Sequence, residues 1–358
     1  MVEIGSALHA QGVAGIALGE TSLRFLIIGC GSMGKRRARG LRKLGYDQIA
    51  AFDIQENRRQ AIAEESQVEV RSDLEQAFAA GVDFVLVCVA PHLHAEYLMR
   101  CIADKRPVFC EAPMALTLED ADGIIEAAED ADVFIAPSCT YLHNAIHAAI
   151  RTMIEGGALG RPLGAVSHVG QHVADWHPYE DYRAFYASKR CQGGMCIDML
   201  PHDLHLFTHL FGEAQALSCM ARKRAADIET DAEACDVYDV MLDMQAGVSL
   251  TIHQDVFQRP WGVYRKIMCE RGAIEWNWRT LRVCEYAGPR FLKEPEWKEV
   301  PIPGYEFEDM YVKEIEHALA AFRGEVEYLM PPRRERHILE LVLACEESSR
   351  TGRHIRFN

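Results

Sequence analysis

One stretch near the start of the chain decides the fold: Arg24-Phe25-Leu26-Ile27-Ile28-Gly29-Cys30-Gly31-Ser32-Met33-Gly34. Its first five residues form a mainly apolar run without alternation, which is typical of a strand covered by helices on both faces. The glycines that follow have the spacing G-x-G-x-x-G. They allow a tight turn, a close approach of the backbone to a pyrophosphate, and close packing of the next helix on the strand. The pattern of residues 35–44 predicts that helix, and its N-terminal N–H groups would face phosphate oxygens.

The fingerprint turn therefore predicts a dinucleotide site, with contacts from Gly29, Gly31, Ser32, Met33 and Gly34. A second strand over residues 48–52 ends at Asp53, about 20 residues after the middle glycine. A carboxylate there accepts hydrogen bonds from the adenosine ribose and repels a 2′-phosphate, so NAD is favoured over NADP.

Two arginines bear on that preference. Arg58 and Arg59 follow Asp53 closely, and pairing with a 2′-phosphate would weaken the preference for NAD. The alternative, which we favour, is that both belong to a solvated helix face. We retain Arg58 as a candidate cofactor contact.

The composition describes a soluble, globular protein of two domains. The chain has 358 residues, 49% of them hydrophobic and 25% charged. Its net charge of −15 argues against a nucleic-acid partner, and no apolar run is long enough to predict a membrane span. The 12 cysteines show no C-x-x-C spacing, which predicts reduced thiols and a cytoplasmic location.

Three regions follow from the order of the predicted elements. Residues 1–22 form an N-terminal extension, frayed or packed, in which Glu3 stands where a signal peptide would be positive. Over residues 23–140, six strands alternate with helices, which predicts an α/β Rossmann domain with a doubly wound parallel sheet. Over residues 141–358, strands follow one another directly, which predicts an α+β domain with a large, mostly antiparallel, open sheet. Helices near the C-terminus could pack back on the first domain.

At this point several motifs, in order, resemble the glucose–fructose oxidoreductase and inositol dehydrogenase (Gfo/Idh/MocA) family. They are the fingerprint Gly29–Gly34, the turn Ala90-Pro91-His92-Leu93-His94, the tripeptide Glu111-Ala112-Pro113, the segment Gly193-Gly194-Met195-Cys196-Ile197-Asp198 with His202, and the ending 347–353. The resemblance implies an NAD(P)-dependent oxidoreductase acting on a hydroxyl or ketone of a sugar, cyclitol or sugar derivative. It also implies that Ala90, His92, His94 and Glu111 lie beside the nicotinamide, where we favour capping and ribose contact for the two histidines.

One departure from the family pattern concerns Ala112. The family carries a lysine there, which assists proton transfer at the substrate hydroxyl, whereas alanine has no such chemistry. Two alternatives to a simple dehydrogenase therefore stay open. One is an NAD-dependent hydrolase or eliminase that uses transient oxidation, and the other is a non-catalytic NAD-binding sensor.

The remaining acid–base chemistry is predicted at Asp198 and His202. Their spacing of four places both side chains on one face of a helix. An imidazole can take the proton from a secondary alcohol, and the carboxylate can hold a neighbouring hydroxyl or steady the imidazole. The alternative without a catalytic role is that Asp198 caps the helix and His202 is a surface histidine. His205 stands where the family usually has an aspartate, and we include it as a substrate contact. No metal site is expected, on this helix or elsewhere in the chain.

An aromatic and charged stretch supplies the other candidate substrate contacts. Trp176, Tyr182 and Arg183 offer rings for sugar faces and a guanidinium for hydroxyls or acids, and Tyr141 stands where the family often has an arginine. The alternative is a loop that merely covers the sheet. Because an open sheet exposes a broad face, we also expect a homodimer or homotetramer.

Overall fold

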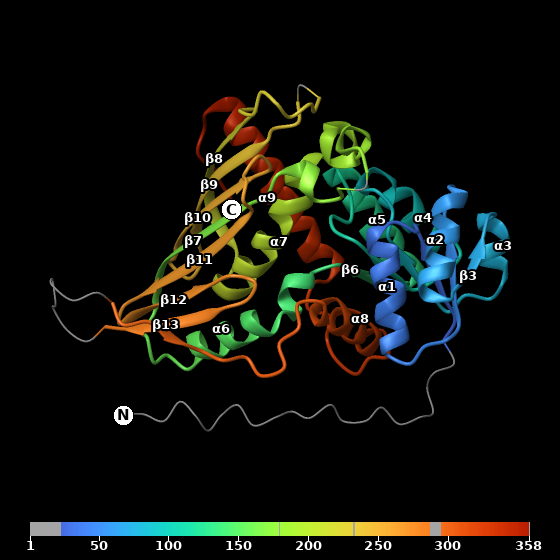
Figure 1. The fold of residues 1–358 in the computed structure, drawn as a ribbon, viewed down its shortest axis with the longest axis horizontal. Helices are drawn as coiled ribbons and strands as arrows, with labels where there is room; N and C mark the ends of the chain where they lie inside the picture. Colours follow the sequence, from blue (N-terminus) through green and yellow to red (C-terminus); the bar gives the residue numbers. More distant parts are fainter. Residues whose placement is uncertain (1–22, 179, 232, 287–294, 358) are drawn as a thin grey trace.

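The fold is described from a computed structural model, which places residues 23–178, 180–231, 233–286 and 295–357. The N-terminal extension predicted for residues 1–22 lies outside the described residues. Two sheets organise the molecule, with helix α7 (Gly194–Phe211) between the larger sheet and the Rossmann domain (Figure 1).

The first sheet confirms the predicted doubly wound architecture. Its six strands are all parallel and lie in the order β3-β2-β1-β4-β5-β6. The strands are β1 (Phe25–Ile28), β2 (Ile49–Phe52), β3 (Glu69–Arg71), β4 (Phe84–Val87), β5 (Val108–Cys110) and β6 (Ile135–Pro137). The helices of this part are α1 (Ser32–Lys43), α2 (Glu56–Ser66), α3 (Leu74–Ala79), α4 (His94–Ala103) and α5 (Leu118–Ala131). The strand order reverses between β1 and β4, where such sheets bind ligands.

The glycines of the fingerprint have distinct structural roles. Gly29 has φ +100°, and a Cβ there would lie 2.6 Å from the Cys88 carbonyl oxygen. A Cβ on Gly34 would collide with the Gly29 carbonyl oxygen, so this glycine lets α1 pack on the turn. A Cβ on Gly31 would meet nothing within 4 Å. Helix α1 begins at Ser32 and not at the predicted residue 35, so the third glycine is already helical.

The second sheet has nine strands in the order β14-β13-β12-β11-β7-β10-β9-β8-β15. They are β7 (Pro162–Gly170), β8 (Ala214–Arg222), β9 (Val237–Met244), β10 (Ser249–Asp255), β11 (Gly262–Cys269), β12 (Gly272–Trp276), β13 (Leu281–Glu285), β14 (Lys298–Glu299) and β15 (Ile355–Arg356). Its central pair, β7 and β10, is parallel and its other pairs are antiparallel. This confirms a mostly antiparallel sheet; the sequence did not predict β13, β14 and β15.

The remaining helices connect the two sheets. They are α6 (Ala145–Glu155), α8 (Asp309–Phe322) and α9 (Pro332–Thr351). Ile315, Ala318 and Leu319 of α8 complete the apolar core on one face of the Rossmann sheet, and Leu339 of α9 joins the core on its other face. The C-terminal helices thus pack back on the first domain, and α8 lies beside α1 (Figure 1).

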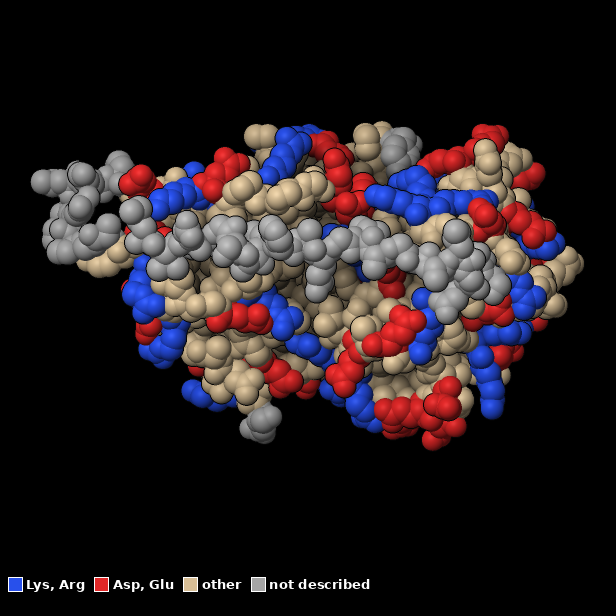
Figure 2. All heavy atoms as spheres, turned by 90° about the horizontal axis from the view of Figure 1, so that it is seen from below, with Lys and Arg blue, Asp and Glu red and all other residues tan. Residues whose placement is uncertain are grey.

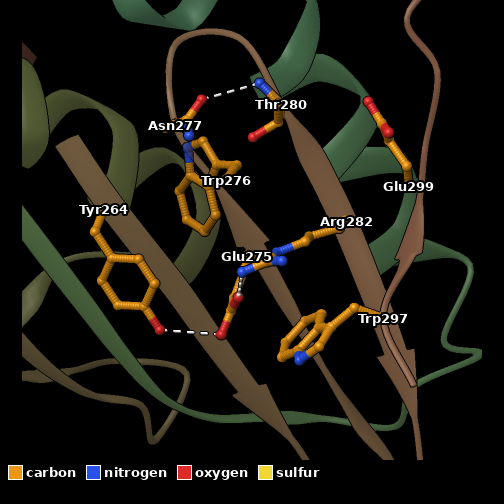
Figure 3. Close-up of a pocket in the computed structure, with 8 residues that line it drawn as sticks. All are labelled: Tyr264, Glu275, Trp276, Asn277, Thr280, Arg282, Trp297 and Glu299. Atoms are coloured by element: carbon orange, nitrogen blue, oxygen red, sulfur yellow. Dashed lines mark hydrogen bonds and ion pairs between the residues drawn. The ribbon is translucent and has the colours of Figure 1, made fainter. Parts of the chain in front are cut away.

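The face of the nine-stranded sheet that points away from α7 carries large apolar side chains in contact with solvent. Met220 is 44% exposed, Met241 61% and Tyr264 42%. A cavity of about 430 Å³ lies on this side, where Glu275 bonds Tyr264 and Arg282 near the ring of Trp297 (Figure 3). It contains none of the residues predicted for the cofactor or substrate site.

On the face shown in Figure 2, basic side chains are interspersed with acidic ones. Among the described helices, none is both long enough and apolar enough to cross a bilayer.

Candidate active site

A cavity of about 930 Å³ opens at the carboxyl ends of the Rossmann strands, against α7 and the end of β7. It brings together most of the residues predicted for the site. Those that line it are Gly29, Gly31, Ser32, Met33, Asp53, Arg58, Ala90, His94, Glu111, Tyr141, Trp176, Asp198 and His202.

The turn between β1 and α1 is suited to hold a pyrophosphate. Gly31 is the N-cap of α1, no side chain caps the helix, and its first turn carries no acidic residue. The first N–H groups of the helix are therefore available to an anion. Asp53 lies beside this turn: it is 7% exposed, and its carboxylate accepts from Cys30 N (2.9 Å) and Gln55 N (2.8 Å). These bonds fix the carboxylate beside the turn.

Arg58 lies at the rim of the same cavity. It lines the cavity and forms a long ion pair with Glu180 (3.7 Å) across it. Arg59 instead donates to the Asp53 carbonyl oxygen (2.7 Å).

His94 has a structural role at the cavity wall. Its side chain is fully buried, with Nδ1 2.7 Å from Pro113 O and Nε2 3.0 Å from Val89 O. Burial lowers its pKa. The ring thus bridges the loops after β4 and β5, and both its nitrogens are engaged.

Glu111 is held in position by the buried Arg37. Arg37 of α1 is 0% exposed and binds Glu111 through Nε (2.6 Å) and Nη2 (3.1 Å), and Glu314 of α8 through Nη2 (2.7 Å). Burial alone would raise the pKa of Glu314, but Arg37 and the hydroxyl of Thr140 outweigh it and hold that pKa below its usual value. This carboxylate–arginine–carboxylate group ties the cavity floor to the C-terminal helices.

Asp198 and His202 project from one face of α7 into the cavity, as their spacing predicts. Tyr186 Oη donates to Asp198 Oδ1 (2.7 Å). Burial raises the pKa of Asp198 to about 6, although the bond from Tyr186 opposes the shift. Burial lowers the pKa of His202 to about 4, so this imidazole is neutral at pH 7.

Aromatic rings fix His202 in the cavity wall. Its ring stacks on Tyr141, with centroids 4.7 Å apart and planes at 22°, and its Nδ1 is enclosed without a hydrogen-bond partner. Behind Tyr141, the buried Arg265 of β11 lies 4.6 Å from the ring centre of Trp278 and is paired with Asp203 of α7 (2.8 Å). The ring of His202 is therefore positioned by Tyr141, whose own ring is backed by Trp278 and Arg265.

Five predicted residues lie elsewhere. His92 is exposed in the turn η1 (Pro91–Leu93), and Gly34 packs under the fingerprint turn. His205 is one turn beyond His202 on α7, where helix α9 covers it and it binds Glu335 of α9 (2.6 Å) in the core. Tyr182 Oη accepts from Glu229 N (3.1 Å), and Arg183 pairs with Asp181 and Glu229 in solvent. These five residues were predicted to contact the cofactor or the substrate, but none of them lines the cavity.

Comparison with known families gives a consistent result. Residues 23–138 match the profile described as "Oxidoreductase family, NAD-binding Rossmann fold", and residues 147–275 match the "GFO/IDH/MocA C-terminal domain". The chain belongs to the Gfo/Idh/MocA family. This confirms the resemblance stated from the motifs.

Several relatives are named as inositol dehydrogenases, among them the following two. The myo-inositol 2-dehydrogenase of Thermotoga maritima is 30% identical over 196 residues, which cover 53% of this chain and 55% of that protein. The inositol 2-dehydrogenase of Acidothermus cellulolyticus is 27% identical over 294 residues, which cover 75% of this chain and 82% of that protein. The chain thus spans about half the length of the first relative. Among solved structures, levoglucosan dehydrogenase in complex with NADH and levoglucosan has a TM-score of 0.79 at 16% identity, covering 93% of this chain and 99% of that one.

The sequence did not single out Tyr186, Arg265 and Trp278. Tyr186 lies at the end of the aromatic stretch that begins at Trp176, so composition was its only signal. Arg265 and Trp278 come from the second sheet, far in sequence from α7, and nothing local marks them. The departure of this Gfo/Idh/MocA chain at Ala112 is not compensated nearby: none of the described residues that line the cavity is a lysine.

Proposed function

We propose that the protein is an NAD-dependent oxidoreductase that moves a hydride between nicotinamide and a hydroxyl or ketone carbon of a sugar, cyclitol or sugar derivative. The observation that carries this proposal is that one cavity joins the fingerprint turn and Asp53 to the Asp198–His202 face of α7. NAD supplies the hydride acceptor; this chain supplies binding, orientation and proton transfer.

His202 is proposed as the acid–base group. With its pKa lowered to about 4, the neutral ring holds a lone pair ready to accept the hydroxyl proton as the hydride leaves. Asp198, fixed by Tyr186, would accept a hydrogen bond from a neighbouring hydroxyl. Since Ala112 offers no proton-transfer group, these two side chains carry that step without the family's lysine.

The cavity wall favours a carbohydrate-like substrate. Tyr141, Trp176, Trp278 and Tyr186 present aromatic surface to it, and sugar rings stack on such surfaces while carboxylates and imidazoles take up their hydroxyls. The names of the inositol and levoglucosan dehydrogenases point to the same substrate class. The cytoplasmic location stays a prediction from the cysteine pattern.

The deciding experiment mixes the purified protein with NAD and a panel of sugars, cyclitols and sugar acids. A dehydrogenase accumulates reduced nicotinamide, measured by its absorbance. A hydrolase or eliminase makes product without net reduction. A sensor binds NAD and ligand, seen as a rise in Tm, with neither change. Either of the last two results would replace the proposed reaction.

Asp53→Ala should weaken NAD binding at least about tenfold, because a hydrogen bond to a charged group is worth about 1.5–3 kcal/mol. The preference for NAD over NADP should narrow as well, since the repulsion of a 2′-phosphate is lost. Asp53→Asn serves as the control, because its single amide oxygen keeps one of the two bonds, to Cys30 N or to Gln55 N, without the charge. Titration with NAD and with NADP measures the ratio of the two affinities. If this ratio is the same in both variants as in the parent, the assignment of Asp53 is contradicted.

The outer face of the second sheet is proposed to pack against a second copy of the chain, as a homodimer or homotetramer. Its exposed Met220, Met241 and Tyr264 form an apolar surface of the kind that oligomers bury. Sedimentation at micromolar concentration should give a multiple of 40.3 kDa. Met241→Asp should shift the mass toward the monomer, whereas Met99→Asp on α4, also exposed, should not. A parent mass equal to one chain would refute the proposal.

A further inference from the structure

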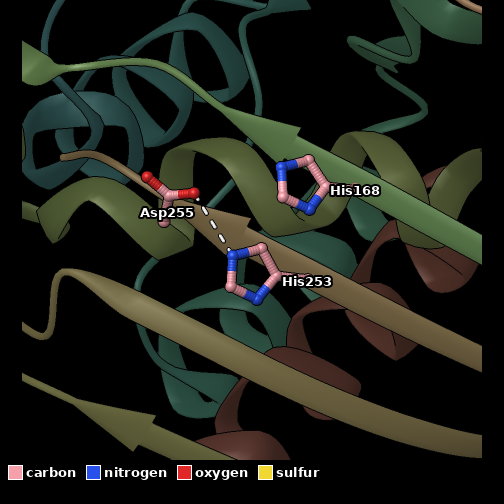
Figure 4. A group of neighbouring side chains, drawn as sticks. All are labelled: His168, His253 and Asp255. Carbon is pink, nitrogen blue, oxygen red and sulfur yellow. Dashed lines mark hydrogen bonds and ion pairs between the residues drawn. The ribbon is translucent and has the colours of Figure 1, made fainter. Parts of the chain in front are cut away.

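Three side chains gather on the outer face of the second sheet, outside the lining of the proposed active site. His168 of β7 and His253 of β10 are directly opposite each other in the parallel pair, and their rings stack with centroids 4.7 Å apart and planes at 15°. Asp255 lies two residues beyond His253 on the same face (Figure 4). One ligand atom from each of the three lies within 4.8 Å of the others, and none of the three lines the active-site cavity.

The cluster is held in place by its neighbours. Asp239 Oδ1 accepts from His253 Nδ1 (2.7 Å), an arrangement that fixes the ring and leaves the lone pair on Nε2. In the neutral ring this lone pair faces Asp255 Oδ2 at 3.2 Å, whereas a ring protonated on both nitrogens would donate to both carboxylates. Asp255 cannot turn away easily, because its Oδ1 accepts from Phe257 N (3.0 Å) and Gln258 N (2.8 Å). A positive charge between His253 Nε2 of the neutral ring and Asp255 Oδ2 would attract both of these electron-rich atoms.

Room for that charge is provided by Gly170. It is opposite Asp255 in the β7–β10 register, and a Cβ at this position would collide with both the Asp255 carboxylate and the Gln258 side chain. Gln258 Oε1 lies 2.7 Å from His168 Nε2 and adds another oxygen beside the cluster. The pocket is thus built from two imidazoles, one buried carboxylate and a neighbouring amide.

We propose that His168, His253 and Asp255 bind one divalent transition-metal ion of the zinc type. Imidazole suits Zn²⁺, Ni²⁺ and Cu²⁺, whereas Mg²⁺ and Ca²⁺ prefer sites made only of oxygen. Binding would move the proton of His168 from Nε2 and leave Gln258 Oε1 or a water to complete the coordination. The alternative is that a protonated His253 ring bridges Asp239 and Asp255 with no metal. The site goes beyond the proposed redox function and does not depend on it.

The test is calorimetric titration of the chelator-treated, full-length protein with ZnCl₂, and separately with MgCl₂. We expect one Zn²⁺ per chain, a rise in Tm with Zn²⁺, and no matching heat with Mg²⁺. His168→Phe and His253→Phe should abolish the Zn²⁺ heat while keeping the stacked rings. Asp239→Asn, at a half-exposed carboxylate, should fold normally and weaken Zn²⁺ binding about 10–100-fold through loss of the ring's orienting partner.

His354→Gln provides the control, because this exposed histidine at the sheet edge contacts Ser218 and lies outside the cluster. It should bind Zn²⁺ as the parent does. Absence of Zn²⁺ binding in the parent would overturn the proposal in favour of the protonated ring. Zn²⁺ binding that persists in both phenylalanine variants, or Mg²⁺ binding of equal strength, would overturn it as well.

Discussion

His202→Gln should lower turnover by at least about 100-fold while NAD affinity and Tm stay near those of the parent, since loss of a general acid–base typically costs 10²–10⁴-fold. Glutamine keeps much of the bulk that packs on Tyr141 but cannot accept a proton at neutral pH. The reaction rate is measured with the best substrate from the panel, and cofactor affinity by titration. Asp198→Asn should have a smaller effect, because Asp198 orients the substrate and does not take the proton.

His209→Gln is the matched control on the same helix. Its ring contacts Arg151 outside the cavity, so turnover should be unchanged. Ala112→Lys should not restore the His202→Gln variant fully, since the family's lysine normally acts alongside the histidine. Full activity in His202→Gln would move the acid–base role to Asp198 or to a tyrosine of the cavity.

The dependence of the reaction rate on pH distinguishes the role of the Asp198 carboxylate from that of the His202 imidazole. With a pKa of about 4, His202 remains deprotonated through the neutral range, whereas Asp198 takes up a proton as the pH falls through about 6. If ionised Asp198 orients the substrate, alcohol oxidation by the parent falls below about pH 6, and Asp198→Asn removes that limb. A parent profile that is flat down to pH 5 would exclude this role for Asp198.

The first domain could be predicted from the sequence because each of its signals is local. The apolar run of β1, the glycine spacing and Asp53 stand within about 30 residues, the size of one βαβ unit. The i,i+4 spacing of Asp198 and His202 is local in the same sense. His205 was misplaced because helical periodicity assigns a face but not which neighbour covers it, and α9 covers that face.

The second domain was harder to predict because its contacts join distant residues. A sheet order in which β7 pairs in parallel with β10 and antiparallel with β11 is not encoded in the alternation of any one strand. Arg265 and Trp278 reach the His202 region only through that topology. The cluster of His168, His253 and Asp255 depends on the same pairing, which is why the sequence predicted no metal site.

Arg37→Met should destabilise the protein by about 3–5 kcal/mol, the usual cost of removing one partner from a buried charge group. The guanidinium is fully buried between Glu111 and Glu314 and lies 4.5 Å from the ring centre of Phe109. Methionine fills similar volume but leaves two enclosed carboxylates without a countercharge. Urea unfolding followed by two probes measures the loss, because a chain with two cores need not unfold in one step.

Arg36→Met tests whether the loss of stability in Arg37→Met comes from the burial of the charge or simply from the loss of one positive charge. Arg36 precedes Arg37 in α1 and is partly exposed; it pairs at 2.9 Å with Glu308, whose side chain is 55% exposed, so its loss should cost no more than about 1 kcal/mol. The pH dependence adds a second check. Arg37 holds the folded-state pKa of Glu314 below its unfolded value, so this stabilisation is complete above the unfolded pKa and is lost as the pH falls through the folded one. The gap between Arg37→Met and the parent should therefore narrow in acid. Equal stability of the two variants at pH 7 would show that the link between the cavity floor and α8 does not depend on this arginine.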